Sequence, residues 1–341
     1  MEPGQPPRLR IATFNVENLG AEVDQGPSLQ DRVRVLRPQL SRLRADVLCL
    51  QEVDGRRPAP GEDRILEALD AVVAGTPYER FARAATLSRS TGAVRDKHNL
   101  VILSRFPILH QEQVFHHLVA PPRHRIATAE PGEVDTIDVA WDRPVLYAAV
   151  ALAPNRTLHV INVHLRAPRA AFIPGHKTDT RAWRSMAGWA EGFFLAAVKR
   201  AGQALEVRLF LDRLFDAEPE PLIAVCGDFN ADVREMPVRI IRGDEEDAAN
   251  PHLVLRTLVP VERSLADSRR FSVVHHGRPQ MLDHVLVSRA LLGWYRNVEI
   301  HNEALGDELI TPHVVAGSPE SFHAPVIAEF RVESGGCDDA G

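Results

Sequence analysis

The sequence is poor in several features that mark particular protein classes. Its 341 residues include only 3 cysteines, Cys49, Cys226 and Cys337, without the spacing of a zinc site or a disulfide framework. No apolar run approaches the roughly 18 residues that a membrane span needs, and no internal repeat appears. Residues 1–7 lack the charged start and apolar segment of a signal peptide, so we expect a cytoplasmic protein.

Lysine is scarce as well. Lys97, Lys177 and Lys199 are the only lysines among 40 basic residues, and the rest are arginine. A net charge of −6 and a pI of about 6.2 argue against tight, non-specific binding of duplex nucleic acid. Arginine pairs well with phosphate groups, although solvation of the surface is the simpler interpretation for most of these side chains. The 45% hydrophobic and 25% charged residues are typical of a globular protein with a large core.

What the sequence does contain is a series of short apolar runs with polar side chains at their ends. The clearest, LIAVCGDFN over residues 222–230, predicts a buried strand that ends in Asp228 and Asn230. Because side chains alternate along a strand, these two lie on the same side of it. A carboxylate and a carboxamide at a strand end suit a divalent cation and a phosphate oxygen. A turn closed by these two side chains is the structural alternative.

Further runs of this design carry the other candidate residues. They are Asn15 in IATFNVEN, Glu52 after DVLCLQ, Asn162 and His164 in LHVINVH, Asp283 at the start of DHVLVS, and His323 before the last apolar run. Asn99 begins another strand-like run, whereas His98 and most other histidines have no such support. Because the polar positions extend from Asn15 to His323 without a linker, we expect one domain over residues 9–332. Residues 1–8 and 333–341 are then flexible termini.

The remaining periodicity predicts alternating strands and helices. Helical spacing covers residues 29–44, 62–74 and 180–216, and strand-like runs cover 9–14, 47–50, 99–104, 145–152 and 158–163. Residues 110–135 favour an irregular surface loop, and 166–178 a basic loop. An aromatic stripe in the longest helical region, which includes Trp189 and Phe193, predicts burial in the core rather than a stacking platform. This order is typical of mixed sheets covered by helices.

Taken in order, the polar motifs resemble those of the endonuclease/exonuclease/phosphatase superfamily of metal-dependent phosphoesterases. The matching segments are Phe14-Asn15, Leu50-Gln51-Glu52, Asn162-Val163-His164-Leu165, Gly227-Asp228-Phe229-Asn230, Leu282-Asp283-His284 and His323-Ala324-Pro325. The resemblance implies an α/β protein of the DNase I-like fold. This is a four-layer α/β/β/α sandwich of two packed mixed β-sheets flanked by helices, with the cleft at one edge.

The resemblance also implies a role for each matched residue. Glu52 and Asn15 would hold Mg²⁺ (or Mn²⁺), and the catalytic residues would be His164, Asp228, Asn230, Asp283 and His323. Asp228 would act on the attacking water, and Asp283 would orient His323. Asn162 and Asn99 are the expected substrate-binding residues. Phe322 departs from the family, which commonly has an aspartate before the final histidine, and this favours a single ion held chiefly by Glu52.

The expected function is therefore that of a phosphodiesterase or nuclease with a phosphodiester substrate such as DNA or RNA. A phosphatase or phosphodiesterase that acts on a small phosphorylated metabolite or a lipid head group is the first alternative. A second alternative, supported by Phe322, is a binding protein that retains the fold without turnover. We expect no membrane contact and no protein partner.

Overall fold

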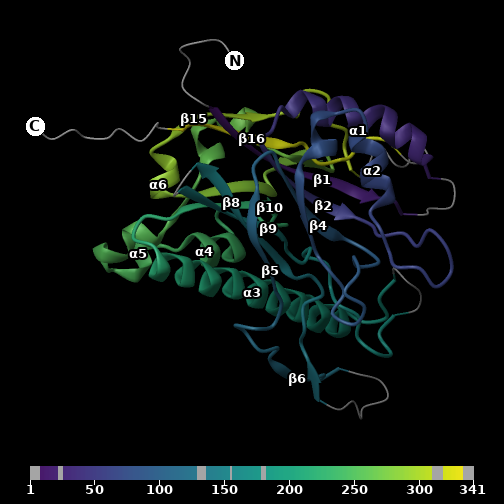
Figure 1. The fold of residues 1–341 in the computed structure, drawn as a ribbon. Helices are drawn as coiled ribbons and strands as arrows, with labels where there is room; N and C mark the ends of the chain where they lie inside the picture. The colour runs from purple at the N-terminus through teal and green to yellow at the C-terminus, as the bar shows by residue number, and fades with distance from the viewer. Residues whose placement is uncertain are drawn as a thin grey trace, which may run out of the picture.

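Two six-stranded sheets pack face to face, and helices cover their outer sides (Figure 1). This computed structural model describes residues 8–21, 26–128, 136–153, 156–177, 182–308 and 318–332. The four-layer α/β/β/α sandwich predicted from the sequence is confirmed. The expected flexible termini, apart from Arg8, lie outside the described residues.

The first sheet joins the beginning and the end of the chain. Its order is β15 (Tyr295–Ile300), β16 (Val326–Arg331), β1 (Arg8–Leu19), β2 (Val47–Val53), β4 (Asn99–Ser104) and β3 (Ala82–Ala85). Strands β1 and β2 run parallel, and β1 pairs antiparallel with β16, the last strand. Helices α1 (Leu29–Leu43) and α2 (Glu67–Val73) lie on the outer face (Figure 1). This sheet takes strands from both ends of the described chain. The single domain over residues 9–332 stays a prediction.

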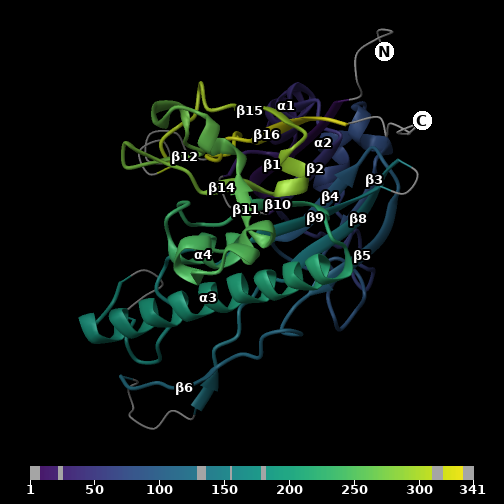
Figure 2. The same cartoon turned by 90° about the vertical axis from the view of Figure 1, so that its left-hand side faces the viewer.

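The second sheet carries the later motifs. Its order is β11 (Leu258–Pro260), β14 (Asp283–Ser288), β10 (Leu222–Asp228), β9 (Arg156–His164), β8 (Val145–Ala153) and β5 (Ile108–Val114). Strands β9 and β10 are parallel, and β14 is antiparallel to β10. Helices α3 (Met186–Ala217) and α4 (Met236–Arg242) cover its outer face (Figure 2).

Several smaller elements lie outside these layers. They are the strand pairs β6 (Arg123–Arg125) with β7 (Thr136–Asp138) and β12 (Val273–His275) with β13 (Arg278–Gln280), helices α5 (Glu245–Ala248) and α6 (Arg289–Leu292), and 3₁₀ turns η1 (Pro77–Arg80), η2 (Pro251–Arg256), η3 (Val261–Ser264) and η4 (Asp267–Arg269). The interval predicted as an irregular loop thus contains part of β5 and β6, and residues 129–135 of it lie outside the described residues.

The main core lies between the two sheets. Alternate residues of the strands, such as Ile11, Val160 and Val285, point into this layer and are fully buried. Cys49 and Cys226 lie in the same layer as free, buried thiols, as their places in apolar strands predict. Each sheet also packs against its covering helices through an apolar cluster of its own.

Local signals explain where the long helices begin. Ser28 caps α1 by accepting a hydrogen bond from Asp31 N, and the helix continues through Pro38 to Leu43. Ser185 caps α3 in the same way through Gly188 N, so this helix begins at Met186 rather than at residue 180. Residues 178–181 lie outside the described residues.

The aromatic stripe of α3 is exposed, so its predicted place in the core is wrong. Met186, Trp189, Phe193 and Phe194 all rank among the exposed large apolar side chains. Figure 2 gives the reason, because the first turns of α3 extend past the sheets toward β6. A small cluster around Ile173 and Leu195 covers only one side of this part of the helix. Within the described residues, no helix is long and apolar enough to cross a bilayer.

Candidate active site

Irregularities in the first sheet place Asn15 and Glu52. The regular pairing of β1 with β2 ends at Asn15, and the register of β2 against β4 shifts between Leu50 and Val53. Glu52 lies inside that shift with a left-handed backbone, φ +61°. A bulge of this kind redirects a side chain at the end of a strand. It brings the carboxylate of Glu52 to the edge where the strands of the second sheet end.

The second sheet contributes a row of three polar residues across adjacent strands. His164 on β9 is the register partner of Asp228 on β10, and Asp228 is the register partner of Asp283 on β14. Gly227 allows this close pairing. It has φ +148°, and an added Cβ would lie 1.9 Å from the carbonyl oxygen of Val163. The row therefore depends on a glycine immediately before Asp228.

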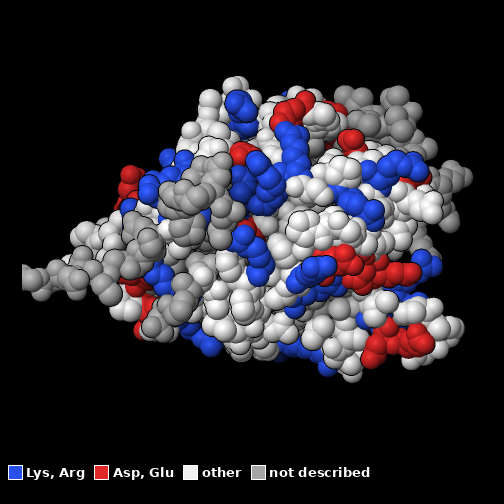
Figure 3. All heavy atoms as spheres, turned by 45° about the horizontal axis from the view of Figure 1, so that its top comes forward, with Lys and Arg blue, Asp and Glu red and all other residues white. Residues whose placement is uncertain are grey.

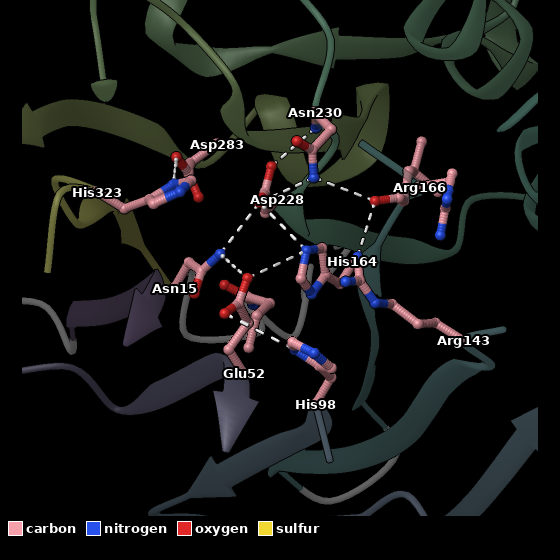
Figure 4. A network of polar contacts seen from close by, with 12 residues as sticks. Asn15, Glu52, His98, Arg143, His164, Arg166, Asp228, Asn230, Asp283 and His323 are labelled. Carbon is pink, nitrogen blue, oxygen red and sulfur yellow. Dashed lines mark hydrogen bonds and ion pairs between the residues drawn. The ribbon is translucent and has the colours of Figure 1, made fainter. Parts of the chain in front are cut away.

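Asn15 joins carboxylates from the two sheets (Figure 4). Its Nδ2 donates to Glu52 Oε1 and to Asp228 Oδ2, each at 3.1 Å. Its Oδ1 accepts from the backbone N of Glu17 at 2.9 Å, which fixes the orientation of the amide. Asn15 therefore acts here as a donor to both carboxylates, and its amide oxygen, the atom with which it could bind a metal ion, accepts a hydrogen bond from the backbone. His164 Nε2 completes the group, 3.5 Å from Glu52 Oε1 and 3.4 Å from Asp228 Oδ2.

Asp228 has the most perturbed carboxyl group of this cluster. Burial, followed by the nearby charge of Asp283, raises its pKa to about 7, and Glu52 contributes in the same direction. Its Oδ1 accepts from Asn230 N at 2.8 Å, and Asn230 Nδ2 donates to Asp228 Oδ2 and to Leu165 O, both at 3.1 Å. The structural turn and the catalytic arrangement considered for this motif are thus compatible. Near neutral pH, Asp228 is poised to exchange a proton.

His323 and Asp283 form the pair that the family resemblance implied. His323 Nδ1 is 2.8 Å from Asp283 Oδ2. Burial lowers the pKa of His323, but Asp283 and the other carboxylates outweigh it, so the pKa lies well above its ordinary value. The segment around His323 is tied to β1, since Ser321 Oγ donates to Asn15 O at 2.7 Å and Phe322 N donates to Glu17 Oε2 at 3.0 Å. His323 is therefore a fixed imidazolium beside Asp228.

His164 has the opposite electrostatics. Burial lowers its pKa well below the ordinary value of histidine, and the charge of Arg143 adds to the effect. Its ring is neutral at neutral pH, and its Nδ1 is buried without a hydrogen-bond partner in the described part of the chain. A neutral imidazole and an imidazolium thus flank Asp228 on its two sides.

Two residues at this site lie outside the sequence predictions. His98 Nδ1 is 3.7 Å from Glu52 Oε2, and His98 has φ +52° in the turn before β4. Arg143 is partly buried beside the cluster and donates to Leu165 O at 3.2 Å. His98 precedes Asn99, a candidate residue, and this was the one available signal. Arg143 precedes β8 with no polar pattern around it.

Asn162 and Asn99 do not face the cleft, and their positions do not support the predicted substrate contacts. Asn162 is fully buried between the sheets, where Nδ2 donates to Leu50 O and Val101 O at 3.0 Å and Oδ1 accepts from Gln51 Nε2 at 2.7 Å. Asn99 is also fully buried, and its amide bonds Val53 O and the turn before β4. Both amides hold together the strands that carry the site.

The donor set fits a hard divalent cation. Ligand atoms of Glu52, His98 and His164 lie within 4.8 Å of one another, and so do those of Asp228, Asp283 and His323. Carboxylates are preferred ligands of Mg²⁺ and Mn²⁺. Glu52 and Asp228 point at one amide group of Asn15, and their mutual repulsion contributes to the raised pKa of Asp228. A cation held by Glu52 would relieve this repulsion, so the residues present fit the predicted ion.

Comparisons with known proteins identify the family and the fold of the chain. A model of the Endonuclease/Exonuclease/phosphatase family matches residues 12–304. No curated protein matches the sequence. Among solved structures, the chain is similar to a variant of the 3' phosphatase NExo from Neisseria bound to a product DNA hairpin, with 18% identity and a TM-score of 0.51, covering 94% of this chain and 99% of that one.

Two further structures have the same fold. Truncated Caenorhabditis elegans TDP2 is 13% identical with a TM-score of 0.54, and the alignment covers 95% of this chain and 98% of that one. A family protein from Beutenbergia cavernae is 18% identical with a TM-score of 0.54, covering 95% of this chain and 72% of that one. The family match, which spans nearly all the motifs, supports a phosphoric ester hydrolase. The chain belongs to the endonuclease/exonuclease/phosphatase family.

Proposed function

We propose that the protein hydrolyses phosphoric diesters by the attack of water, with Mg²⁺ or Mn²⁺ as cofactor. The observation that carries this proposal is the row of His164, Asp228 and Asp283 across three strand ends, facing Glu52 of the other sheet. Together with His323 and Glu52, the row provides a proton acceptor, Asp228, an imidazolium held by Asp283, and a carboxylate for a cation within one small space. Membership of the family supports the same class of reaction.

Each part of the reaction has a residue positioned for it. Asp228 takes the proton from the attacking water, and Asn15 and Asn230 orient its carboxylate through hydrogen bonds of 3.1 Å to Oδ2. His323, held by Asp283, stabilises negative charge on the phosphoryl group and supplies a proton to the leaving oxygen. When bound by Glu52, a divalent cation supplies charge neutralisation at the phosphoryl oxygens.

Nuclease activity on DNA or RNA is the preferred form of this proposal. Arg143 and Arg166 lie at one side of the cluster, where a polynucleotide backbone would pass (Figure 4). On the face in Figure 3, basic side chains form separate groups divided by acidic and uncharged residues. This pattern favours a short or flexible strand over tight duplex binding. A small phosphorylated metabolite, a lipid head group and a non-catalytic binding role are the competing outcomes. The cytoplasmic location stays a prediction.

The test compares hydrolysis of bis-p-nitrophenyl phosphate, p-nitrophenyl phosphate and plasmid DNA with Mg²⁺, Mn²⁺ or EDTA. We expect divalent-dependent cleavage of the diester that Glu52→Gln abolishes and that the exposed control Glu62→Gln retains. Nicking of the plasmid would support a nuclease, and turnover of the monoester alone would replace the proposal with a phosphatase. A folded protein without turnover in any metal would overturn the enzymatic proposal.

A further inference from the structure

A cavity of about 410 Å³ opens beside the proposed catalytic cluster. Basic side chains supply most of its polar lining. The lining residues are Arg95, Asp96, Lys97, His98, Asp142, Arg143, Arg166 and Gln203. They come from the turn before β4, from the segment before β8, from the segment after β9 and from α3. The cavity is thus built from several elements that also carry the catalytic residues.

Two residues connect this cavity to the catalytic cluster. His98 lines it and lies 3.7 Å from Glu52, measured between Nδ1 and Oε2. Arg143 lines it and donates to the carbonyl oxygen of Leu165, which also accepts from Asn230. Figure 4 places Arg143 and Arg166 beside His164, on the opposite side of the cluster from His323. The cavity therefore extends the catalytic site in one direction.

The charges of the lining leave a positive excess. Its two carboxylates already have basic partners outside the cavity, since Asp96 Oδ1 is 2.7 Å from Arg64 NH1 and Asp142 Oδ1 is 3.9 Å from Lys199 Nζ. Asp142 is also 3.3 Å from Arg166 NH1. The lining thus has four cationic residues, Arg95, Lys97, Arg143 and Arg166, against two carboxylates, and basic residues outside the cavity already pair with both of these.

An unsatisfied donor and two arginines with lowered pKa values favour the same conclusion. Arg166 Nε is buried without a hydrogen-bond partner in the part of the chain that the structure describes. Burial lowers the pKa of both Arg95 and Arg143, because a charged guanidinium group loses hydration when it is held away from water. An anion in this cavity would supply acceptors and offset that loss. Guanidinium groups match the oxygens of a phosphate especially well.

We infer that this cavity binds a second phosphate group of the substrate, next to the phosphate that is cleaved. The inference rests on the proposed function and narrows it. A substrate with one phosphate, such as a simple lipid head group or a monoester, would leave the cavity unused. A polynucleotide or another compound with two or more phosphates would fill both positions.

The first test compares matched esters in the presence of Mg²⁺ or Mn²⁺. They are the p-nitrophenyl ester of thymidine 5′-phosphate with and without a 3′-phosphate, and that of thymidine 3′-phosphate with and without a 5′-phosphate. We expect one of the two pairs to show a higher kcat/KM for the member with the second phosphate. Equal values within both pairs would overturn the inference and leave the proposed hydrolase intact.

The test quantity is the ratio of kcat/KM for the ester with the second phosphate to that for the ester without it. Arg166→Ala and Lys97→Ala should each lower this ratio about tenfold, because losing a hydrogen bond to a charged group has at least this effect on binding. Arg34→Ala is the matched control. Both arginines form an ion pair with an aspartate, Arg34 with Asp31 at 3.0 Å and Arg166 with Asp142 at 3.3 Å. Arg34 is exposed and lies on α1, outside the cavity. It should leave the ratio unchanged. If Arg34→Ala had an equal effect, the preference for the second phosphate would come from the general charge of the surface, and the inference of a phosphate site in this cavity would be wrong.

A binding measurement separates this inference from the proposed function. Inorganic pyrophosphate is titrated into the protein in EDTA, where no turnover occurs, and the heat of binding is recorded. We expect saturable binding that Arg166→Ala weakens and Arg34→Ala does not. Absence of binding would count against the cavity even in an active enzyme. Competition by a phosphorylated thymidine dinucleotide and by a sugar bisphosphate then distinguishes a polynucleotide from a small polyphosphate.

Discussion

Asp228 is the residue in which burial and charge are most directly linked to chemistry. It is 1% exposed, and its pKa is raised to about 7 by burial and by Asp283. We predict that Asp228→Asn lowers kcat by a factor of about 10² to 10⁴, the usual contribution of a general base. The measurement is kcat for the diester with saturating metal. A variant with near wild-type kcat would remove Asp228 from the proposed mechanism.

The pH dependence of the same reaction has a definite sign. A proton acceptor must be ionised, so kcat/KM should fall as pH decreases through the pKa of Asp228. A bound cation favours the ionised form of Asp228. The fall in kcat/KM on the acid side of the pH profile, its acid limb, should then occur below pH 7. The acid limb should therefore lie higher in pH when metal is limiting than when metal is saturating. A limb that does not move with metal would indicate a titrating group remote from the ion.

Single residues mark where sequence reasoning was sufficient and where it was not. The alternation of side chains correctly predicted that Asn162 and His164 share one face of β9. It could not predict depth. Each residue rises about 3.3 Å along a strand, so Asn162 lies about 7 Å further from the edge, inside the core. His98 was missed because its position depends on a left-handed turn, which leaves no periodic signal.

At the scale of elements, the junction of β9 and β10 depends on Gly227. An added Cβ would lie 1.9 Å from Val163 O. We predict that Gly227→Ala destabilises the protein far more than Gly61→Ala, a control whose φ of +90° is also left-handed but which has open space around it. The control should cost about 1 kcal/mol from backbone strain alone. Urea unfolding of both variants measures the difference, and equal losses would contradict the steric argument.

A second element contact holds the segment after Asn230. His284 Nδ1 is 2.5 Å from Glu262 Oε1, and His284 Nε2 is 2.8 Å from Ala231 O. Both partners are acceptors, so the ring donates from both nitrogens and is an imidazolium. Burial lowers the pKa of His284, but Glu262 and the Ala231 carbonyl raise it to a net value above that of free histidine. We predict that His284→Gln costs about 3–5 kcal/mol, as expected when one partner of a buried ion pair is removed.

The sign of the pH effect follows from the raised pKa of His284. Its contribution to stability is complete below the unfolded pKa of about 6.5 and is lost as pH rises through the folded pKa. Wild type should therefore lose free energy of unfolding relative to His284→Gln as pH rises above about 6.5. The exposed residue His110 provides the control His110→Gln, which should follow the wild type. Parallel curves for all three proteins would refute the imidazolium assignment.

Elements also differ in how well the sequence predicted them. Strand β4 was predicted with its bounds, because six buried residues in a row leave little ambiguity. The stripe on α3 was misplaced because helical spacing identifies an apolar face but not what covers it. That depends on how far the sheet extends, which is a property of tertiary structure. The candidate site residues at strand ends were easier to locate, since the ends of buried runs can be found from the sequence alone.

At the scale of the whole molecule, the site joins the two sheets. Asn15 and Glu52 belong to the first sheet, and His164 and Asp228 to the second. Their side chains meet at the edge of the interface, where the like charges of Glu52 and Asp228 oppose close packing. Such a site is a source of instability that a cation would remove. Unfolding separates the two sheets, so binding of an ion must be coupled to global stability.

We therefore predict that Mg²⁺ or Mn²⁺ raises Tm in a saturable way. An ion at 100 times its Kd contributes about 2.7 kcal/mol, equivalent to several degrees for a chain of this size. Glu52→Gln should have two effects of opposite sign. It should raise Tm in EDTA, because one of the opposing charges is gone, and it should abolish the increase with metal. Glu62→Gln should show neither effect. A metal-dependent increase that survives in Glu52→Gln would place the ion elsewhere, whereas a lower Tm of this variant in EDTA would mean that Glu52 stabilises the fold through its bonds to Asn15 and Asn18 rather than straining it.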